Sequence, residues 1–166
     1  MRKNRIITNF LEDASFKSIQ KTLLSPSFPW YYNSEVAHRD NPKEKTSHLF
    51  YMTHVFYLDH KFNSDQMDIL APLLNKLAPK ALIRIKANLY THTLTLHQHP
   101  PHIDYNFPHQ AAIYSINTND GFTVLKNNNK IKSKANQIVF FDGSEYHSST
   151  TCTNQQIRVN IGINYF

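Results

Sequence analysis

The sequence predicts a mainly β (α+β) fold, in which a double-stranded β-helix, or jelly-roll, barrel is supported by N-terminal helices. Two observations carry this prediction. After residue 80, several short segments have the composition and the period of strands, and turn signals separate them. Before residue 80, apolar residues recur at helical spacing. The 166 residues suit a single domain, 1–166, in which 1–80 form helical support and a lid and 81–166 form the barrel core.

Two helices are expected before the barrel. Asn9 is expected to cap a helix that continues to about Leu24, because an asparagine side chain accepts hydrogen bonds from the first helical amides. Residues 64–79 are expected to form the second helix, with Ser64 as its N-cap and a stripe of apolar residues along one face. Pro72 counts against an unbroken helix there, since proline lacks the backbone donor. Both helices would pack on the outside of the barrel.

The clearest strand is "ALIRIKANLY" at residues 81–90. Its apolar and polar side chains fall on opposite faces: Ile83, Ile85, Ala87 and Leu89 on one, Arg84, Lys86, Asn88 and Tyr90 on the other. Further strands are expected at residues 109–117, 121–126, 136–141, 147–151 and 157–166. Helices on the outside of the barrel would cover the apolar face of 81–90, so its polar face is expected to point inward.

The composition favours a soluble globular enzyme or binding protein. Hydrophobic residues make up 40% and charged residues 18%, which excludes a disordered chain. No apolar run is long enough for a membrane span, and the start lacks a signal-peptide core, so a cytoplasmic location is expected, in a bacterium or in a virus-infected host cell. Cys152 is the only cysteine, which excludes an internal disulfide and a cysteine-built zinc site.

The net charge of +6 leaves two interpretations open. One is a surface that binds nucleic acid. The other is a solvated surface rich in lysine and asparagine, which we prefer because no aromatic and basic recognition motif accompanies the charge. The sequence does not indicate the oligomeric state.

His102-x-Asp104, within "HPPHIDYN", is the first candidate for a metal site. Chance alone gives about 0.7 such His-x-acid pairs in a chain of this composition, and a second pair, His38-x-Asp40, does occur. Side chains two apart on a strand point to the same face, so His102 and Asp104 could both point into a barrel. His38-x-Asp40 lies in a polar segment, 38–48, without a strand signal.

Two further residues raise the first pair above chance. His147 follows an apolar strand and a turn, and Arg158 begins the last strand. Two histidines and one carboxylate leave coordination positions open, which suits non-haem Fe(II) oxygenases that bind a co-substrate and O2 together. A guanidinium can bind a carboxylate through two parallel hydrogen bonds, as a dicarboxylate co-substrate requires.

These residues, in this order, resemble the 2-oxoglutarate- and Fe(II)-dependent dioxygenases, especially the prolyl-4-hydroxylase-like branch. The resemblance covers about residues 81–166 and is carried by His102-x-Asp104, "AAIYSINTNDGFTVL", "NQIVFFDGSEYHSS" and "RVNIGINYF". The N-terminal "RIITNFLEDASF" is similar to the usual opening of the family, more weakly. The chain departs from the family in three places. Asp120-Gly121 stands where that branch has two glycines, the loop between the two metal-binding segments is short, and an arginine replaces the lysine common in collagen-type prolyl hydroxylases.

The resemblance implies a role for each site residue. His102, Asp104 and His147 would be the iron ligands, and Arg158 would bind the distal carboxylate of 2-oxoglutarate. Tyr90 would hydrogen-bond the same co-substrate, and Asn88 and Asn160 would line its pocket: these three are the remaining cofactor-binding candidates. The reaction implied is hydroxylation of a C–H bond with O2, yielding succinate and CO2, with ascorbate as an optional reductant. The favoured substrate is a prolyl residue in a protein or peptide, and a small molecule remains open.

Several alternatives remain open at this point. Glu145 is a competing carboxylate two residues before His147, and His97 or His99 could replace a histidine ligand. "RVN" at 158–160 resembles the Arg-x-Asn of nucleic-acid demethylases in the same superfamily, although Asn164 stands where that group has a second arginine. A non-catalytic, cupin-like metal-binding barrel would use no 2-oxoglutarate. The polar segment 38–48 and residues 91–101 are the candidate lids.

Overall fold

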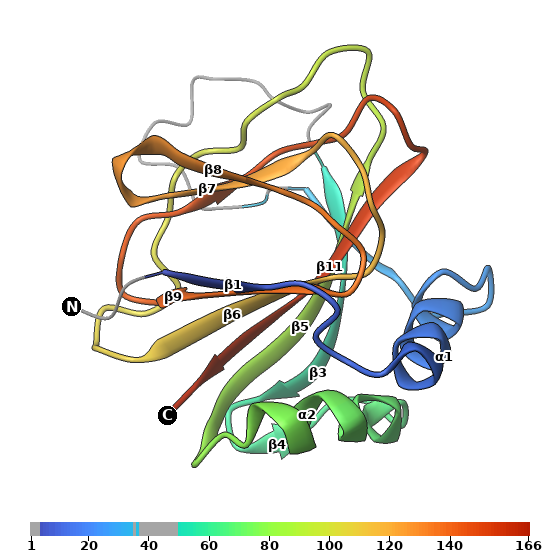
Figure 1. Ribbon diagram of the computed structural model, residues 1–166, viewed down its shortest axis with the longest axis vertical. Helices are drawn as coiled ribbons and strands as arrows, with labels where there is room; N and C mark the ends of the chain where they lie inside the picture. The colour runs from blue at the N-terminus through green and yellow to red at the C-terminus, as the bar shows by residue number, and fades with distance from the viewer. Residues whose placement is uncertain (1–3, 35, 37–49) are drawn as a thin grey trace.

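Two antiparallel sheets face each other and enclose the interior of the barrel (Figure 1). The computed structural model describes residues 4–34, 36 and 50–166. The elements before residue 80 are β1 (Arg5–Ile7), α1 (Asp13–Leu23), β2 (Tyr31–Asn33), β3 (Tyr51–Leu58), β4 (Lys61–Phe62), the 3-10 helix η1 (Met67–Leu70) and α2 (Ala71–Leu77). After it come β5 (Leu82–Thr91), β6 (Gln110–Ser115), β7 (Phe122–Leu125), the 3-10 turn η2 (Lys126–Asn128), β8 (Asn129–Lys132), β9 (Gln137–Asp142), β10 (Ser148–Ser149) and β11 (Ile157–Tyr165). The predicted mainly β barrel with N-terminal helices is confirmed.

The large sheet has the strand order β1-β9-β6-β11-β5-β3-β2, with β4 paired to β3. The small sheet has the order β10-β7-β8. Antiparallel bridges Gln98↔Thr150 and His102↔His147 place the segment that precedes β6 beside β10. The small sheet is thereby extended by a segment that carries one of the predicted metal ligands.

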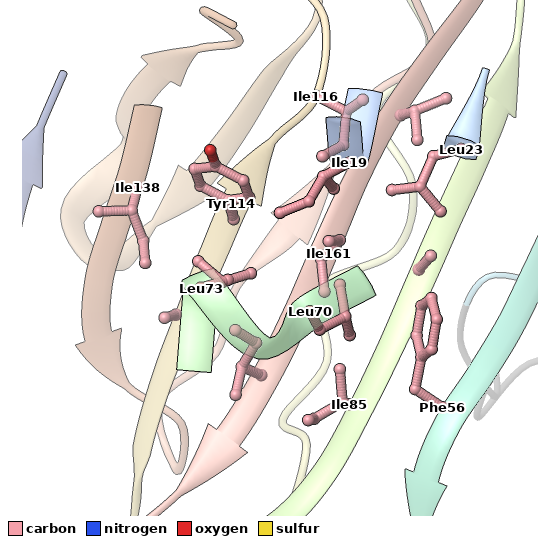
Figure 2. Close-up of a cluster of buried hydrophobic side chains, with 14 of the residues drawn as sticks. Ile19, Leu23, Phe56, Leu70, Leu73, Ile85, Tyr114, Ile116, Ile138 and Ile161 are labelled. Carbon is pink, nitrogen blue, oxygen red and sulfur yellow. The ribbon is translucent and has the colours of Figure 1, made fainter. Parts of the chain in front are cut away.

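Both helices pack on the outer face of the large sheet, as predicted. Figure 2 shows side chains from the helical segments, Ile19, Leu23, Leu70 and Leu73 among them, packed against Ile85 and Ile161 of the sheet. All six side chains are fully buried, which makes this layer the main hydrophobic core. Since strand side chains alternate, this packing turns the other face of β5 and β11 toward the barrel interior.

The first helix begins later than predicted. α1 starts at Asp13, and Asn9 is not its cap, because Asn9 has a left-handed backbone with φ of 50° in the turn before the helix. The chain there is fixed to the sheet instead: the amide of Phe10 donates to the carbonyl of Asn136 at 2.9 Å. Asparagine tolerates the left-handed region better than most residues, so Asn9 serves the turn.

The second helical segment accommodates Pro72, which counted against an unbroken helix over residues 64–79. It divides into η1 and α2, and Pro72 lies in the first turn of α2. The first amides of a helix have no partner inside the helix, so a proline costs nothing there. Ser64 accepts a hydrogen bond from the amide of Gln66 at 3.0 Å and therefore caps the preceding turn rather than a long helix.

The first 80 residues also supply strands that the sequence did not predict, β3 above all. The run "YMTHVFYL" of β3 is apolar or aromatic on both faces except at Thr53, because the core covers one face and the barrel interior the other. The pair His38-x-Asp40 and the candidate lid 38–48 lie outside the described residues. In the part of the chain that the structure describes, no helix combines the length and apolar character needed to cross a membrane.

Candidate metal centre

The structure brings His102, Asp104 and His147 together in the wall of one cavity. Their ligand atoms all lie within 4.8 Å of one another. Nε2 of His102 lies 3.9 Å from Oδ1 of Asp104, and Nε2 of His147 lies 3.8 Å from Oδ2. The three residues predicted as ligands therefore converge on one point.

The backbone sets this convergence. His102 and His147 form an antiparallel bridge in which each amide donates to the other's carbonyl at 2.9 Å. Directly opposed residues on such a bridge place their side chains on the same side, and the two imidazole centroids are 4.5 Å apart. Asp104, two residues after His102, adds its carboxylate to the same side.

The donor set suits a divalent transition metal. Nδ1 of His147 donates to the carbonyl of Glu145 at 3.1 Å, which leaves Nε2 unprotonated and directed at Asp104. Burial lowers the pKa of His147. Burial also lowers the pKa of His102, and the neighbouring imidazole of His147 lowers it further, to about 4. Both imidazoles are neutral at pH 7, as metal binding requires. Two nitrogens and one carboxylate match the ligands of non-haem Fe(II).

Asp104 is held by a chain of polar side chains. Burial alone would raise its pKa, but Arg84, the neighbouring His147 and Asn164 together lower it to about 2. Nη2 of Arg84 donates to Oδ1, and the amide of Asn164 donates to Oδ2 at 2.8 Å. The same amide donates to Nε2 of the buried His109 at 3.0 Å, and Oδ1 of Asn164 accepts from Nε of Arg84 at 3.2 Å. His109 is thus two hydrogen bonds from the carboxylate.

Gly143 allows His109 to occupy this position. A Cβ atom at residue 143 would lie 2.0 Å from Nε2 of His109, well inside van der Waals contact. We expect Gly143→Ala to displace the His109 ring, break its bond to Asn164 and lower the free energy of unfolding by about 1–3 kcal/mol. Urea denaturation at pH 7 measures this. Gly162→Ala is the control, because its Cβ would meet only atoms at 3.7 and 3.8 Å; equal losses in both variants would contradict the expectation.

Three of the four predicted cofactor-binding residues line the cavity that contains the candidate metal site. Asn88 and Tyr90 on β5 and Asn160 on β11 all border it, and Nδ2 of Asn88 donates to Oδ1 of Asn160 at 2.9 Å. The ring of Tyr90 stacks on Tyr51 of β3, with centroids 5.8 Å apart. The polar face of β5 is therefore the inner face, as predicted.

Arg158 lies behind the cavity wall. It is 1% exposed, and its guanidinium carbon lies 5.1 Å from the ring centroid of Tyr90. It donates to Oγ of Ser133 at 2.7 Å, to the carbonyl of Thr150 at 3.0 Å and to Oγ1 of Thr123 at 3.1 Å. Tyr90 and Thr123 border the cavity. These bonds account for three of the guanidinium's five N–H donors, which leaves one N–H on each terminal nitrogen.

The alternative ligands take no part in the triad. Glu145 forms an ion pair with Lys126 at 2.7 Å. His97 lies 3.2 Å from the hydroxyl of Thr95 through Nε2. His99 is 2% exposed and donates from Nδ1 to Ser149. Its ring lies 5.2 Å from the ring of Tyr90, so His99 belongs to the wall beside the cavity.

His99 gives the fold a dependence on pH. Burial lowers its pKa to about 4, against 6.5 when unfolded. The unfolded chain therefore binds the proton first, and stability present above pH 6.5 is lost as the pH falls toward 4. At pH 5 this amounts to about 1–2 kcal/mol. Urea denaturation of the metal-free protein at pH 7, 6 and 5 measures it. We expect His99→Gln to flatten the profile by that amount; an unchanged profile would contradict a buried, neutral His99.

The family resemblance assigned no role to four residues around the site: Tyr51, Arg84, Lys86 and Asn164. Arg84 and Lys86 share the polar face of β5 with Asn88 and Tyr90, and Asn164 follows Asn160 with the same parity on β11. The strand period had already placed Arg84 and Lys86 on the inward face of their strand, and it could have added Asn164. Tyr51 carried no such signal, because β3 does not alternate.

Comparisons of the fold find 2-oxoglutarate-Fe(II) oxygenases among the structures that this chain resembles. A viral collagen prolyl hydroxylase from Paramecium Bursaria Chlorella virus-1, solved with 2-oxoglutarate, is 11% identical, covers 99% of this chain and 97% of its own, and has a TM-score of 0.64. A prolyl hydroxylase from Trichoplax adhaerens, in complex with a peptide of hypoxia inducible factor, is 13% identical over 98% and 83% of the two chains, with a TM-score of 0.65.

A third similar structure acts on a different kind of molecule. The epimerase SnoN, solved with Fe3+, α-ketoglutarate and nogalamycin RO, is 11% identical over 98% of this chain and 78% of its own, with a TM-score of 0.62. No family model and no curated protein matches the sequence. At these identities the comparisons confirm the fold that the resemblance implied. Any statement about the chemistry of this chain depends on the geometry of its own site residues.

Proposed function

We propose that this chain is an Fe(II)- and 2-oxoglutarate-dependent dioxygenase that hydroxylates a C–H bond and forms succinate and CO2. One observation carries the proposal: His102, Asp104 and His147 converge inside a jelly-roll barrel whose neighbours are 2-oxoglutarate-Fe(II) oxygenases. When bound, the iron would supply the redox chemistry that couples O2 and 2-oxoglutarate to the substrate.

The remaining residues of the cavity have binding roles in this proposal. Arg158, with one unused donor on each terminal nitrogen, would bind the distal carboxylate of 2-oxoglutarate bidentately. Tyr90, Asn88 and Asn160 would hydrogen-bond the co-substrate from the cavity wall. The barrel would exclude bulk water from the reacting atoms, which strengthens these polar interactions.

The favoured substrate is a prolyl residue in a protein or peptide. Two similar structures are prolyl hydroxylases, and one of them holds a peptide. In this chain an open groove begins at His147 and runs between the loop of η2 and the segment before β6. Its lining includes Pro101, Leu125 and the exposed Tyr146, a mixture of apolar and polar surface that suits an extended peptide.

Aerobic turnover tests the proposal. The full chain is incubated with Fe(II), 2-oxoglutarate, ascorbate and proline-containing peptides. Two products are measured: succinate, and a peptide whose mass has increased by one oxygen atom, about 16 Da. We expect succinate to form and to rise with substrate. The proposal would be contradicted if no substrate gave succinate and if His102→Ala bound Fe(II) as tightly as the wild type.

One observation favours a second candidate, a nucleic-acid-directed dioxygenase. The arginine missing at position 164 has a spatial substitute, because Arg84 pairs with Asn164 across β5 and β11 and reaches Asp104. With a net charge of +6, such an enzyme would bind DNA or RNA with an affinity that falls steeply with salt. Binding that is absent at low salt would exclude this candidate.

A further inference from the structure

A lysine side chain lies in the barrel interior, where lysine is rarely found. Lys86 is on the inner face of β5, between Arg84 on the metal side and Asn88 on the side of Arg158, and it borders the cavity. Residues two apart on a strand are about 6.6 Å apart along it. The ammonium of Lys86 is therefore within reach of a ligand that occupies the cavity beside the metal.

Lys86 has no counter-charge of its own. Asp104 is the one carboxylate among the described residues that border the cavity, and it is paired with Arg84. Lys86 donates to the hydroxyl of Tyr51 at 3.3 Å and lies 5.4 Å from the centroid of that ring. Burial and the charge of Arg84 lower the pKa of Lys86 to about 8, against a smaller opposing contribution from Asp104. A half-buried ammonium without an anion of its own is unfavourable, and an anionic ligand would reduce that cost.

Gly162 leaves space next to this ammonium. It pairs directly with Lys86 in the β5–β11 register and borders the cavity, while the inward positions on both sides of it carry asparagine side chains. A Cβ there would approach nothing closer than 3.7 Å. The absence of a side chain at 162 therefore opens the cavity wall opposite Lys86, at the place where a ligand group could lie.

We propose that Lys86 and Tyr51 form a second carboxylate-binding subsite, which Gly162 opens beside the metal site. The identity of its ligand rests on the proposed function: the carboxylate would belong to the primary substrate or to 2-oxoglutarate. The primary substrate is favoured, since Arg158 and the metal would already take both ends of 2-oxoglutarate. The enzyme would then prefer substrates that carry a carboxylate close to the hydroxylated carbon.

The test follows Lys86 directly. The full chain, labelled with 13C at the lysine ε carbons and loaded with Zn(II) as a diamagnetic substitute for iron, is titrated with acetate and with 2-oxoglutarate. The Lys86 resonance is the one missing from the Lys86→Met spectrum. We expect it to shift and saturate, and we expect Gly162→Val, which fills the space without changing charge, to weaken the response about tenfold or more. The exposed Lys132 on β8 is the internal control.

The arms of the experiment separate the two sources. If acetate still shifts Lys86 when 2-oxoglutarate is saturating, the subsite serves the primary substrate; if 2-oxoglutarate shifts Lys86 and displaces acetate, it serves the co-substrate. The inference is overturned if neither ligand shifts the Lys86 resonance at concentrations that leave the Lys132 resonance unshifted. It is also overturned if the Lys86 resonance shifts as much in Gly162→Val as in the wild type. The readout needs no turnover, so a saturable shift without any succinate formation would count against the proposed function alone.

Discussion

His147→Ala is expected to abolish succinate formation and to weaken Fe(II) binding by about 100-fold or more, because only two ligands would remain. His147 is 8% exposed and its Nε2 already faces Asp104, so no neighbouring group can take its place without rearranging the bridge to His102. The measurement is an anaerobic titration of the metal-free protein with Fe(II), followed by 2-oxoglutarate, with the visible charge-transfer band as the signal.

His92→Ala is the matched control for this substitution. His92 is exposed at the end of β5 and lies outside the described cavity lining, so its loss should leave the titration unchanged. A His147→Ala variant that binds Fe(II) as tightly as His92→Ala would show that the three side chains do not form the iron site.

Arg158→Met is expected to raise the dissociation constant for 2-oxoglutarate by about 100-fold, which corresponds to roughly 3 kcal/mol. Methionine keeps much of the volume but removes the charge and the two unused donors. The hydroxyls of Ser133 and Thr123 and the carbonyl of Thr150 also lose their donor. We therefore expect a loss of stability as well, of about 1–3 kcal/mol or more. Calorimetric titration under nitrogen and urea denaturation measure the two effects.

Arg158→Lys and the Fe(II) titration keep this prediction interpretable. Lysine retains the charge without the bidentate geometry, so we expect an intermediate loss of 2-oxoglutarate affinity. Fe(II) binding should be preserved in both variants, because Arg158 does not contact the triad. Unchanged 2-oxoglutarate affinity in a folded Arg158→Met protein that still binds Fe(II) would show that the co-substrate is anchored elsewhere.

The sequence predicted a site residue correctly where the alternation of a single strand determines which face carries its side chain. His102 and Asp104 had to share a face, and Tyr90 had to lie inward once Ile85 was assigned to the core. Pro72 lies in the first turn of α2, so the expectation of a helix there was correct and only the extent was wrong. These features depend on interactions within a few residues of one another.

Other features depend on contacts between distant segments and left no local pattern. β3 is buried on both faces, so "YMTHVFYL" lacks the alternation that marks a half-exposed strand. Asn164 holds Asp104 from 60 residues away in the chain and is itself bonded to His109, and no spacing rule links these residues. Asn9 was expected to cap a helix because its side chain suits a cap, although the backbone required a left-handed turn instead.

The bridge between His102 and His147 has a consequence for how metal is gained and lost. The two imidazoles are fixed by backbone hydrogen bonds 45 residues apart in sequence, and Asp104 is oriented by Arg84 and Asn164. None of these bonds involves a metal ion. Unlike small domains that are unfolded without zinc, this barrel would be preorganised for the proposed metal. A chelator should therefore remove a bound ion, and added Fe(II) should restore it, with the chain folded throughout.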